Sequence, residues 1–500
     1  MLDKIKRLGT DTAVYGVSTI LGRFLTFLLT PLYVNVLPPS EVGILATVFA
    51  YIAFLNILYG YGFEGAYMKY TSTLEVGDRK QNFSVPFLSL LITSLAFSVC
   101  IAWKSGPLAA IINLSEPYHS LPVYAAWIMF LDAVALVPFA SLRMAGKAKL
   151  FASIKMANIV VNVACNAVFL IYYRMGIEAI FYSNIIASAI TLLLLLPTIL
   201  SNLTFSWNGP LYRALLRFGL PTVPSFIATM MIQLIDRPIL EVMTDKATVG
   251  IYQANYRLGI FMMLVVSMFD FAWRPFFLSH AREPDAKPLF ARVLTYFVFV
   301  TAWVFLIVSF FIEDVVKLPI FWGRSILPEP YWNGLAIVPV VLLAYVFLGM
   351  SNNMVAGIYI EKKTAKLPAI TFLGAFVNVA ANLLLIPKLG IMGAAIATLA
   401  SYLIMAVVLY FTVQKFYPVE YELSRLMKIA LAALLVFGLG SFMHFGSMEI
   451  LWKCALLVLF ALLMYWMKFF EPAELSTLSR LFSRQQRPVA PPETPPYLGS

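Results

Sequence analysis

The sequence predicts an all-α polytopic membrane protein of about 14 transmembrane helices, built as two pseudo-symmetric six-helix lobes plus a C-terminal helix pair. Of its 500 residues, 61% are hydrophobic and only 12% are charged, a composition typical of membrane proteins rather than of soluble ones. Apolar segments long enough to cross a bilayer recur along the chain. Parts of the first half also recur in the second half, as expected for two homologous lobes.

The individual helices are predicted from windows of about 20 apolar residues, the length that spans the hydrocarbon core. In chain order they cover residues 12–36, 42–66, 83–103, 121–141, 154–173, 178–200, 218–240, 249–273, 292–312, 333–357, 367–387, 391–414, 427–445 and 450–470. The connecting loops are too short to fold as separate domains. The expected units are therefore an N-terminal lobe (1–208), a C-terminal lobe (209–415), helices 13 and 14 (416–470) and a polar, proline-rich cytoplasmic tail (471–500).

Two internal repeats support the lobes. The segment 31–44 aligns with 238–251 at a shift of 207 residues, which places Val42-Gly43-Ile44 on Val249-Gly250-Ile251. The motif VNVACN at 161–166 recurs as VNVAAN at 377–382. Because each repeat holds an even number of helices, both lobes have the same orientation. We expect them to superpose about an axis along the membrane normal.

Basic residues predict the orientation of the helices. With the N-terminus placed in the cytoplasm, 26 of the 36 Lys and Arg residues fall in inner segments and 8 in outer ones. The positive-inside rule then predicts that both termini lie in the cytoplasm. The net charge of +11 comes from these basic residues in short inner loops, which orient the helices. We therefore expect no nucleic-acid partner.

Polar residues line one face of two predicted helices. The first helix carries Arg23, Thr26 and Thr30 on such a face, and the seventh carries Thr229, Gln233 and Asp236, each at spacings of 3 or 4 residues. Gln233 aligns with Thr26 in the repeat. The matching faces indicate a shared central cavity, and hydrogen bonds between helices are the alternative explanation.

Ionisable residues inside predicted membrane helices are costly and therefore count as functional candidates. Arg23 and Asp132 are the deepest. Arg274 is expected to extend to the cytoplasmic surface, and Asp236 and Arg237 to cap or pair near the outer end of their helix. Glu64, Arg257 and Asp270 are either functional groups or salt-bridge partners near the membrane surface.

A stripe of Lys155, Asn158, Asn162 and Asn166 on the fifth helix recurs in part as Asn378 and Asn382, and we interpret it as lobe packing. The three His and three Cys residues are scattered and show no metal-ligand or nucleophile spacing. The sequence therefore predicts neither an enzyme nor a metal site nor a cofactor.

Three stretches carry a resemblance to a known family. They are the segment 14–70 (VYGVSTILGRFLTFLLTPLYVNVLPPSEVGI and onward), IDRPILEVMTDKATVGIYQANYRLG at 235–259, and NLLLIPKLGIMGAAIATLASYL at 382–403. The chain over about residues 5 to 415 resembles the polysaccharide transporter family of the MOP superfamily. That family contains the Wzx-type O-antigen flippases, and the MATE exporters and the lipid II flippase MurJ are its relatives.

The resemblance implies a V-shaped, MATE-like bundle in the bacterial inner membrane. It implies translocation of an undecaprenyl-diphosphate-linked oligosaccharide to the outer leaflet for O-antigen, capsule or exopolysaccharide synthesis, by alternating access coupled to H⁺ or Na⁺. Membrane lipids, a polysaccharide polymerase and other assembly proteins are the implied partners. The candidate residues are Arg23, Thr26, Gln233 and Arg257 for substrate binding, and Glu64, Asp132 and Asp270 for ion coupling.

Two other functions remain open. A small-molecule MATE exporter shares the implied fold but lacks the family motifs quoted above. A membrane polysaccharide polymerase or ligase requires a sizeable outer loop, whereas the largest outer loop predicted here has about 20 residues.

Overall fold

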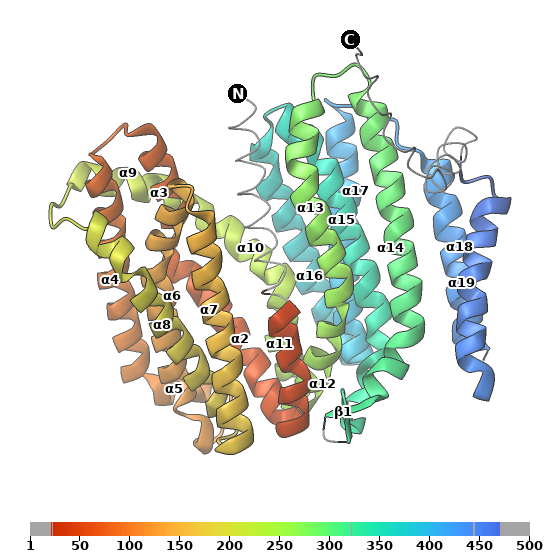
Figure 1. Cartoon of the computed structure of the whole chain (residues 1–500), viewed down its shortest axis with the longest axis horizontal. Coiled ribbons are helices and arrows are strands. Elements are labelled where there is room, and N and C mark those ends of the chain that lie inside the picture. The colour runs from red at the N-terminus through yellow and green to blue at the C-terminus, as the bar shows by residue number, and fades with distance from the viewer. Residues whose placement is uncertain (1–21, 23, 322, 444–445, 471–500) are drawn as a thin grey trace, which may run out of the picture.

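The computed structural model describes residue 22 and residues 24–321, 323–443 and 446–470, and almost all of them are helical (Figure 1). Thirteen helical segments in this part of the chain are long and apolar enough to cross a membrane. The shorter apolar helix Phe24–Val36 is the described part of the first expected helix. The predicted all-α membrane fold is confirmed. The tail 471–500 lies outside the described residues.

The first lobe follows the expected helix order, with two changes. The second expected helix is broken into α2 and α3 at Tyr61 and Gly62, and the fifth continues from α7 into a π-helical turn, η2. The elements are α2 (Pro39–Gly60), α3 (Phe63–Thr73), α4 (Arg79–Trp103), α5 (Ser105–Ile111), η1 (Glu116–Tyr118), α6 (Leu121–Met144), α7 (Ala148–Ala167), η2 (Val168–Tyr172) and α8 (Glu178–Asn202).

The second lobe begins with a helix that is broken twice, as its prolines require. Pro221 and Pro224 lie at the junction of η3 and α10, where a missing amide hydrogen interrupts the helical bonding. The elements are α9 (Gly209–Gly219), η3 (Leu220–Thr222), α10 (Val223–Leu234), α11 (Asp236–Met243), α12 (Lys246–Tyr256), η4 (Arg257–Gly259), α13 (Ile260–His280), α14 (Ala286–Lys317), η5 (Glu329–Ile337), α15 (Val338–Ile360), η6 (Thr364–Lys366), α16 (Leu367–Leu389) and α17 (Ile391–Gln414).

The turn between α11 and α12 is capped by Asp245. Its carboxylate accepts hydrogen bonds from the Thr248 hydroxyl at 2.6 Å and the Thr248 amide at 2.9 Å. These bonds stabilise the charged form and hold the pKa of Asp245 below its usual value. The cap starts α12 at a defined residue and so sets the position of the residues that follow.

The two lobes meet where α2 crosses α12, and the crossing is symmetric. A Cβ atom on Gly43 would lie 1.7 Å from the main-chain oxygen of Lys246, and one on Gly250 would lie 2.0 Å from that of Pro39. Both pairs are related by the 207-residue shift of the repeat, because Pro39 corresponds to Lys246 and Gly43 to Gly250. Such a reciprocal contact is the signature of a two-fold axis, here a pseudo-two-fold axis between the lobes.

The asparagine repeat gives a second symmetric pair. Asn166 Nδ2 donates to the main-chain oxygen of Asn162 at 2.8 Å and to its Oδ1 at 3.0 Å, and Asn382 makes the same two bonds to Asn378 at the same distances. Tyr33 OH also donates to Asn166 Oδ1 at 3.1 Å, which ties the first helix to α7. These contacts agree with a packing role. The bounds of the lobes at 208 and 415 stay a prediction.

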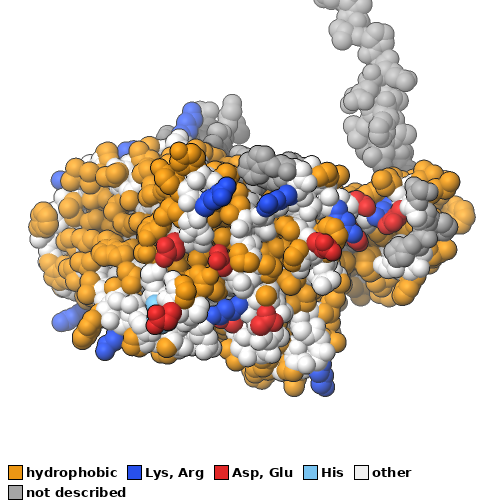
Figure 2. All heavy atoms as spheres, turned by 90° about the horizontal axis from the view of Figure 1, so that it is seen from below, with side chains coloured by type: hydrophobic (Ala, Val, Ile, Leu, Met, Phe, Trp, Pro, Cys, Tyr) orange, Lys and Arg blue, Asp and Glu red, His pale blue; other side chains and the backbone are white. Residues whose placement is uncertain are grey.

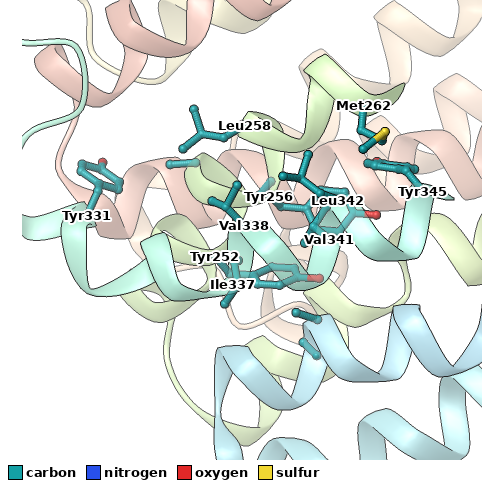
Figure 3. Packing of buried hydrophobic residues seen from close by; sticks show 14 of the residues in the cluster. Tyr252, Tyr256, Leu258, Met262, Tyr331, Ile337, Val338, Val341, Leu342 and Tyr345 are labelled. Carbon is teal, nitrogen blue, oxygen red and sulfur yellow. The ribbon is translucent and has the colours of Figure 1, made fainter. Parts of the chain in front are cut away.

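Aromatic and aliphatic side chains pack α12 against α15 and η5 (Figure 3). Tyr252 and Tyr256 lie on α12, and Tyr345 on α15 contacts Tyr256 edge to face at 6.2 Å between ring centroids. Asn255 Nδ2 also donates to the main-chain oxygen of Tyr331 at 2.8 Å. The C-terminal end of α12, where Arg257 follows, is thereby held against the rest of its lobe.

The last two helices, α18 (Leu423–Phe442) and α19 (Glu449–Trp466), lie beyond α14 on the side away from the first lobe (Figure 1). Lys453 on α19 pairs with Asp314 on α14 at 2.7 Å between Nζ and Oδ2. η7 (Gly446–Met448) precedes α19. Two short strands, β1 (Pro319–Phe321) and β2 (Arg324–Ser325), form an antiparallel hairpin after α14.

The lower face in Figure 1 bears α5, α12 and β1. Seen from that side, hydrophobic side chains cover the flanks of the molecule, while charged and polar ones gather along the middle (Figure 2). This is the distribution expected of a bundle surrounded by lipid and wetted at its ends. The predicted orientation makes this face the outer one.

The orientation can be tested with single cysteines in a variant in which Cys100, Cys165 and Cys454 are replaced by serine. Ser72 at the end of α3 and Ser115 before η1 are both exposed. We expect Ser115→Cys to react with a membrane-impermeant maleimide in intact cells, and Ser72→Cys to react only after the membrane is permeabilised. Labelling of both from outside would contradict the orientation.

Candidate functional site

A cavity of about 640 Å³ lies between the two lobes. Thr26 of the first helix and Lys155 of α7 line it from the N-terminal lobe, and Arg237, Gln253 and Arg257 line it from the C-terminal lobe. A smaller cavity of about 260 Å³ shares Thr26, Arg237, Gln253 and Arg257 with it and reaches Val42 and Ala46 of α2. Together they form a hollow, here called the interlobe cavity, that extends from Lys155 to the α2–α12 crossing.

Arg257 reaches the interlobe cavity from the break between α12 and α13. The chain makes one tight turn there, η4, before α13 begins at Ile260. The Arg257 guanidinium donates to the Thr30 hydroxyl at 3.2 Å, and among the described residues no carboxylate lies within ion-pair distance of it. Its charge is therefore available to an anion in the cavity.

Arg237, in contrast, is held by fixed partners. Its guanidinium pairs with Asp236 at 2.5 Å, donates through Nε to Gln253 Oε1 at 3.0 Å, and lies 4.4 Å from the centroid of the Tyr256 ring. The other Asp236 oxygen accepts from Tyr252 OH. The sequence predicted pairing or capping for these two residues, and they do pair. We did not include Arg237 among the substrate candidates, yet it forms part of the cavity wall.

Lys155 is the second residue that the sequence interpretation did not assign to the site. Its side chain is exposed to the cavity rather than packed between lobes, with Nζ 4.3 Å from the centroid of the Phe139 ring. A lysine inside a predicted membrane helix was the available signal. The sequence interpretation assigned its stripe to lobe packing because the pattern recurs in the second half of the chain.

The four candidate substrate residues have different positions. Thr26 and Arg257 line both parts of the interlobe cavity. Gln233 on α10 accepts a hydrogen bond from Arg237 through its main-chain oxygen, but its side chain does not line either part. Arg23 lies outside the described residues. The structure thus brings together Thr26 and Arg257, and adds Arg237 and Lys155 to them.

Two of the three ion-coupling candidates share a separate cavity inside the N-terminal lobe. This cavity, called the N-lobe cavity below, measures about 480 Å³ and is lined by Glu64 of α3 and Asp132 of α6. Glu64 forms an ion pair with Arg143, and the Ser188 hydroxyl donates to Asp132 at 2.8 Å.

The third candidate, Asp270, lies elsewhere. It lines a cavity of about 210 Å³ in the C-terminal lobe and pairs with Arg274 at 3.3 Å, one helical turn further along α13. It is therefore not part of the acidic pair in the N-terminal lobe. Among the described residues no group of three or more His, Cys, Asp or Glu side chains could hold a metal ion.

The charge of the interlobe cavity differs from that of the other two. Its described lining residues include the cations Lys155, Arg237 and Arg257 and no Asp or Glu. A cleft with cations on mostly apolar walls attracts anions, and guanidinium groups match phosphate oxygens in geometry as well as charge.

The chain is similar to a protein family and to several solved structures. A family model described as "Polysaccharide biosynthesis protein" matches residues 8–280. No curated protein matches the chain. Among solved structures, one described as "Lipid II flippase MurJ, inward closed conformation" superposes with a TM-score of 0.73 at 15% identity, covering 95% of this chain and 99% of that one.

Multidrug resistance MATE transporters share the architecture too. One in an inward-facing conformation gives a TM-score of 0.63 at 15% identity, covering 82% of this chain and 96% of that one. One in an outward-facing conformation gives 0.57 at 15% identity, covering 81% and 95%. At such low identity these likenesses concern the fold alone. The family match spans more than half of the chain, and the protein therefore belongs to the polysaccharide biosynthesis protein family and has the fold of the MOP superfamily.

Proposed function

We propose that the protein is a flippase that carries an undecaprenyl-diphosphate-linked oligosaccharide across the plasma membrane for the synthesis of a cell-surface polysaccharide. The observation that carries this proposal is the charge of the interlobe cavity, which three cations and no carboxylate line among the described residues. The diphosphate is the anionic group common to all such substrates. Arg257 is the cation best placed for it because no carboxylate among the described residues pairs with it.

The same charge distribution argues against a MATE-like exporter of cationic compounds. A cation entering the interlobe cavity would meet Lys155 and Arg257 without a carboxylate on the described walls. Like charges repel, and mostly apolar walls weaken this repulsion less than water does. An anionic headgroup gains energy at the same place.

The substrate crosses the membrane by alternating access, in which the interlobe cavity opens first to the inner side and then to the outer side. The bodies of the lobes touch at the α2–α12 crossing, at the end of the molecule that the orientation places outside, while at the inner end α9, the first helix of the second lobe, packs on α3 where Gly62 and Gly219 meet. The interlobe cavity extends from this crossing toward Lys155, near the inner end of α7. This conformation would receive substrate from the inner leaflet.

For coupling to H⁺ or Na⁺ we propose Asp132. Glu64 and Asp270 each form an ion pair with an arginine, which stabilises their charged forms and makes proton uptake less favourable. Asp132 forms no ion pair among the described residues: it accepts a hydrogen bond from the neutral Ser188 hydroxyl, and the nearby Lys155 cation attracts it from beyond ion-pair distance. Its carboxylate is open to the N-lobe cavity, so an ion can reach it.

Deletion of the gene tests the proposed function. We expect cells without it to lose the surface polysaccharide and to accumulate undecaprenyl-diphosphate-linked oligosaccharide in the inner leaflet, and a plasmid copy to restore both. Unchanged surface polysaccharide, together with new sensitivity to cationic drugs, would contradict the flippase and favour the exporter.

A milder change at Lys155 probes the inner part of the interlobe cavity. We expect Lys155→Gln to weaken binding of the lipid-linked substrate about tenfold, because one charge-assisted hydrogen bond contributes about 1.5–3 kcal/mol and water replaces part of it. Lys149→Gln, exposed on the same helix and outside the cavities, is the control and should bind as the wild type does. Equal affinities of the two variants in a detergent binding assay would remove Lys155 from the site.

A further inference from the structure

We propose that the N-lobe cavity is a saccharide-binding subsite, which holds the sugars next to the diphosphate while the diphosphate itself lies in the interlobe cavity. This inference rests on the proposed function. It adds where the glycan binds and what chemistry selects it.

The two cavities adjoin along shared walls. Phe151 and Lys155 of α7 line both the main part of the interlobe cavity and the N-lobe cavity. Asn184 of α8 lines the N-lobe cavity and the smaller part of the interlobe cavity. A diphosphate near Lys155 therefore has its first sugars next to the N-lobe cavity, without any further movement of the lobes.

The charge of the N-lobe cavity suits a neutral glycan. Its lining includes two carboxylates, Glu64 and Asp132, and two cations, Arg143 and Lys155, so the formal charges cancel. The Glu64–Arg143 ion pair removes one charge of each sign. A diphosphate gains little in such a place, in contrast to the interlobe cavity.

Neutral hydrogen-bonding groups supply the rest of the wall. Asn158, Asn184, Ser188 and Thr191 line the cavity. Asn158 Nδ2 donates to Thr191 Oγ1 at 2.9 Å, which orients the amide, and Asn184 Nδ2 donates to the main-chain oxygen of Ile180 at 2.7 Å. Among the described residues no hydrogen bond ends on the Oδ1 atom of either amide, so each oxygen can accept one from a sugar hydroxyl.

An apolar wall and the size of the cavity complete the match. The rings of Phe139 and Phe151 meet edge to face at 5.2 Å between centroids, and both residues line the cavity. A pyranose has apolar C–H faces that pack on aromatic rings. A volume of about 480 Å³ falls within the range of about 300–1,000 Å³ usual for small-ligand sites with few polar groups on apolar walls.

A variant that removes the polar wall without leaving an unpaired group tests the subsite. Asn158 and Thr191 bond to each other, so Asn158→Leu combined with Thr191→Val removes both partners of one hydrogen bond and nearly keeps the volume. Asp132 is left intact, which separates saccharide binding from ion coupling. Two probes are compared on the purified full-length protein: undecaprenyl diphosphate, and undecaprenyl diphosphate that carries a neutral trisaccharide.

We expect the wild type to bind the glycosylated probe about tenfold more tightly than the bare lipid, a difference within the reach of two or three hydrogen bonds. The double variant should lose this preference and keep its affinity for the bare lipid. Retained affinity for the bare lipid also shows that the variant is folded. If both probes bind more weakly to the double variant, the single variant Asn184→Leu is tested instead. It too should lose the preference for the glycosylated probe and keep its affinity for the bare lipid.

The outcomes separate the subsite from the proposed function. A wild type that binds both probes equally, or a double variant that keeps the full preference, overturns the subsite and leaves the diphosphate site standing. A wild type that binds neither probe overturns both. Arg257→Ala should weaken both probes alike, because it acts on the diphosphate.

Discussion

Replacement of Arg257 by alanine is expected to reduce translocation of the lipid-linked oligosaccharide by at least about 30-fold, because truncation of one partner of a desolvated charge pair costs about 2 kcal/mol or more. Arg257 is the cation of the interlobe cavity with no acidic partner among the described residues, and only the Thr30 hydroxyl orients it. Arg257→Lys should retain part of the activity, since it keeps the charge but loses the planar fork suited to phosphate.

The matched control for this result is Arg213→Ala, an exposed arginine on α9 that lines none of the cavities described above. It should translocate substrate at the wild-type rate. Each variant is compared at equal amounts of protein in the membrane. If Arg257→Ala inserts normally and supports full export of surface polysaccharide in the deletion strain, the diphosphate does not bind at Arg257.

The second large effect is expected from alanine at either glycine of the α2–α12 crossing. In Gly43→Ala the new methyl group would overlap the main-chain oxygen of Lys246, and in Gly250→Ala that of Pro39. A main-chain atom in a packed helix cannot turn aside as a side chain can, so the helices must separate. Because the crossing is symmetric, both variants should lose most of their transport.

Labelling distinguishes an opened crossing from an unfolded protein. Ala46 is buried beside the crossing and lines the interlobe cavity. Ala46→Cys should react slowly with an impermeant maleimide added from outside in the otherwise cysteine-free protein, because the crossing opens only during transport, and should react much faster when Gly43→Ala is added. Gly438→Ala on α18, where an added methyl meets nothing within 4 Å, is the control. Full transport with a protected Ala46→Cys in Gly43→Ala would contradict this view of the crossing.

The helices and their repeat were predictable because both depend on patterns within one segment. Hydropathy alone places the twelfth helix at 391–414, the bounds that α17 has in the structure. The alignment of Gly43 with Gly250 was also visible in the sequence. The sequence could not show that these two glycines form the contact between the lobes, because each meets the opposite helix only when the lobes pack.

The candidate site was predictable in part. Thr26 and Arg257 were identified from polarity and from the resemblance, and the structure brings them to one cavity. The argument for Gln233 assumed that the polar face from Thr229 to Asp236 continues along one helix. The helix breaks at Ile235, directly after Gln233, and Arg237 on the next segment, α11, forms the cavity wall instead.

Partners that come from distant segments were the least predictable. Sequence spacing cannot reveal that Arg143 of α6 neutralises Glu64 of α3, or that Ser188 of α8 bonds to Asp132. It is this pairing that distinguishes the acids from one another. The same limit applies to Lys155, whose helix shows a polar stripe but not which of its members face a cavity.

The flippase itself is tested most directly in proteoliposomes that contain an undecaprenyl-diphosphate-linked oligosaccharide with a fluorophore on the glycan. An impermeant quencher added outside reaches only the outer leaflet unless the lipid crosses. We predict that wild-type vesicles become fully quenchable, whereas empty vesicles and vesicles with Arg257→Ala lose only the outer-leaflet signal. Wild-type vesicles that behave as empty ones do, while they export a cationic drug in a parallel assay, would contradict the assignment.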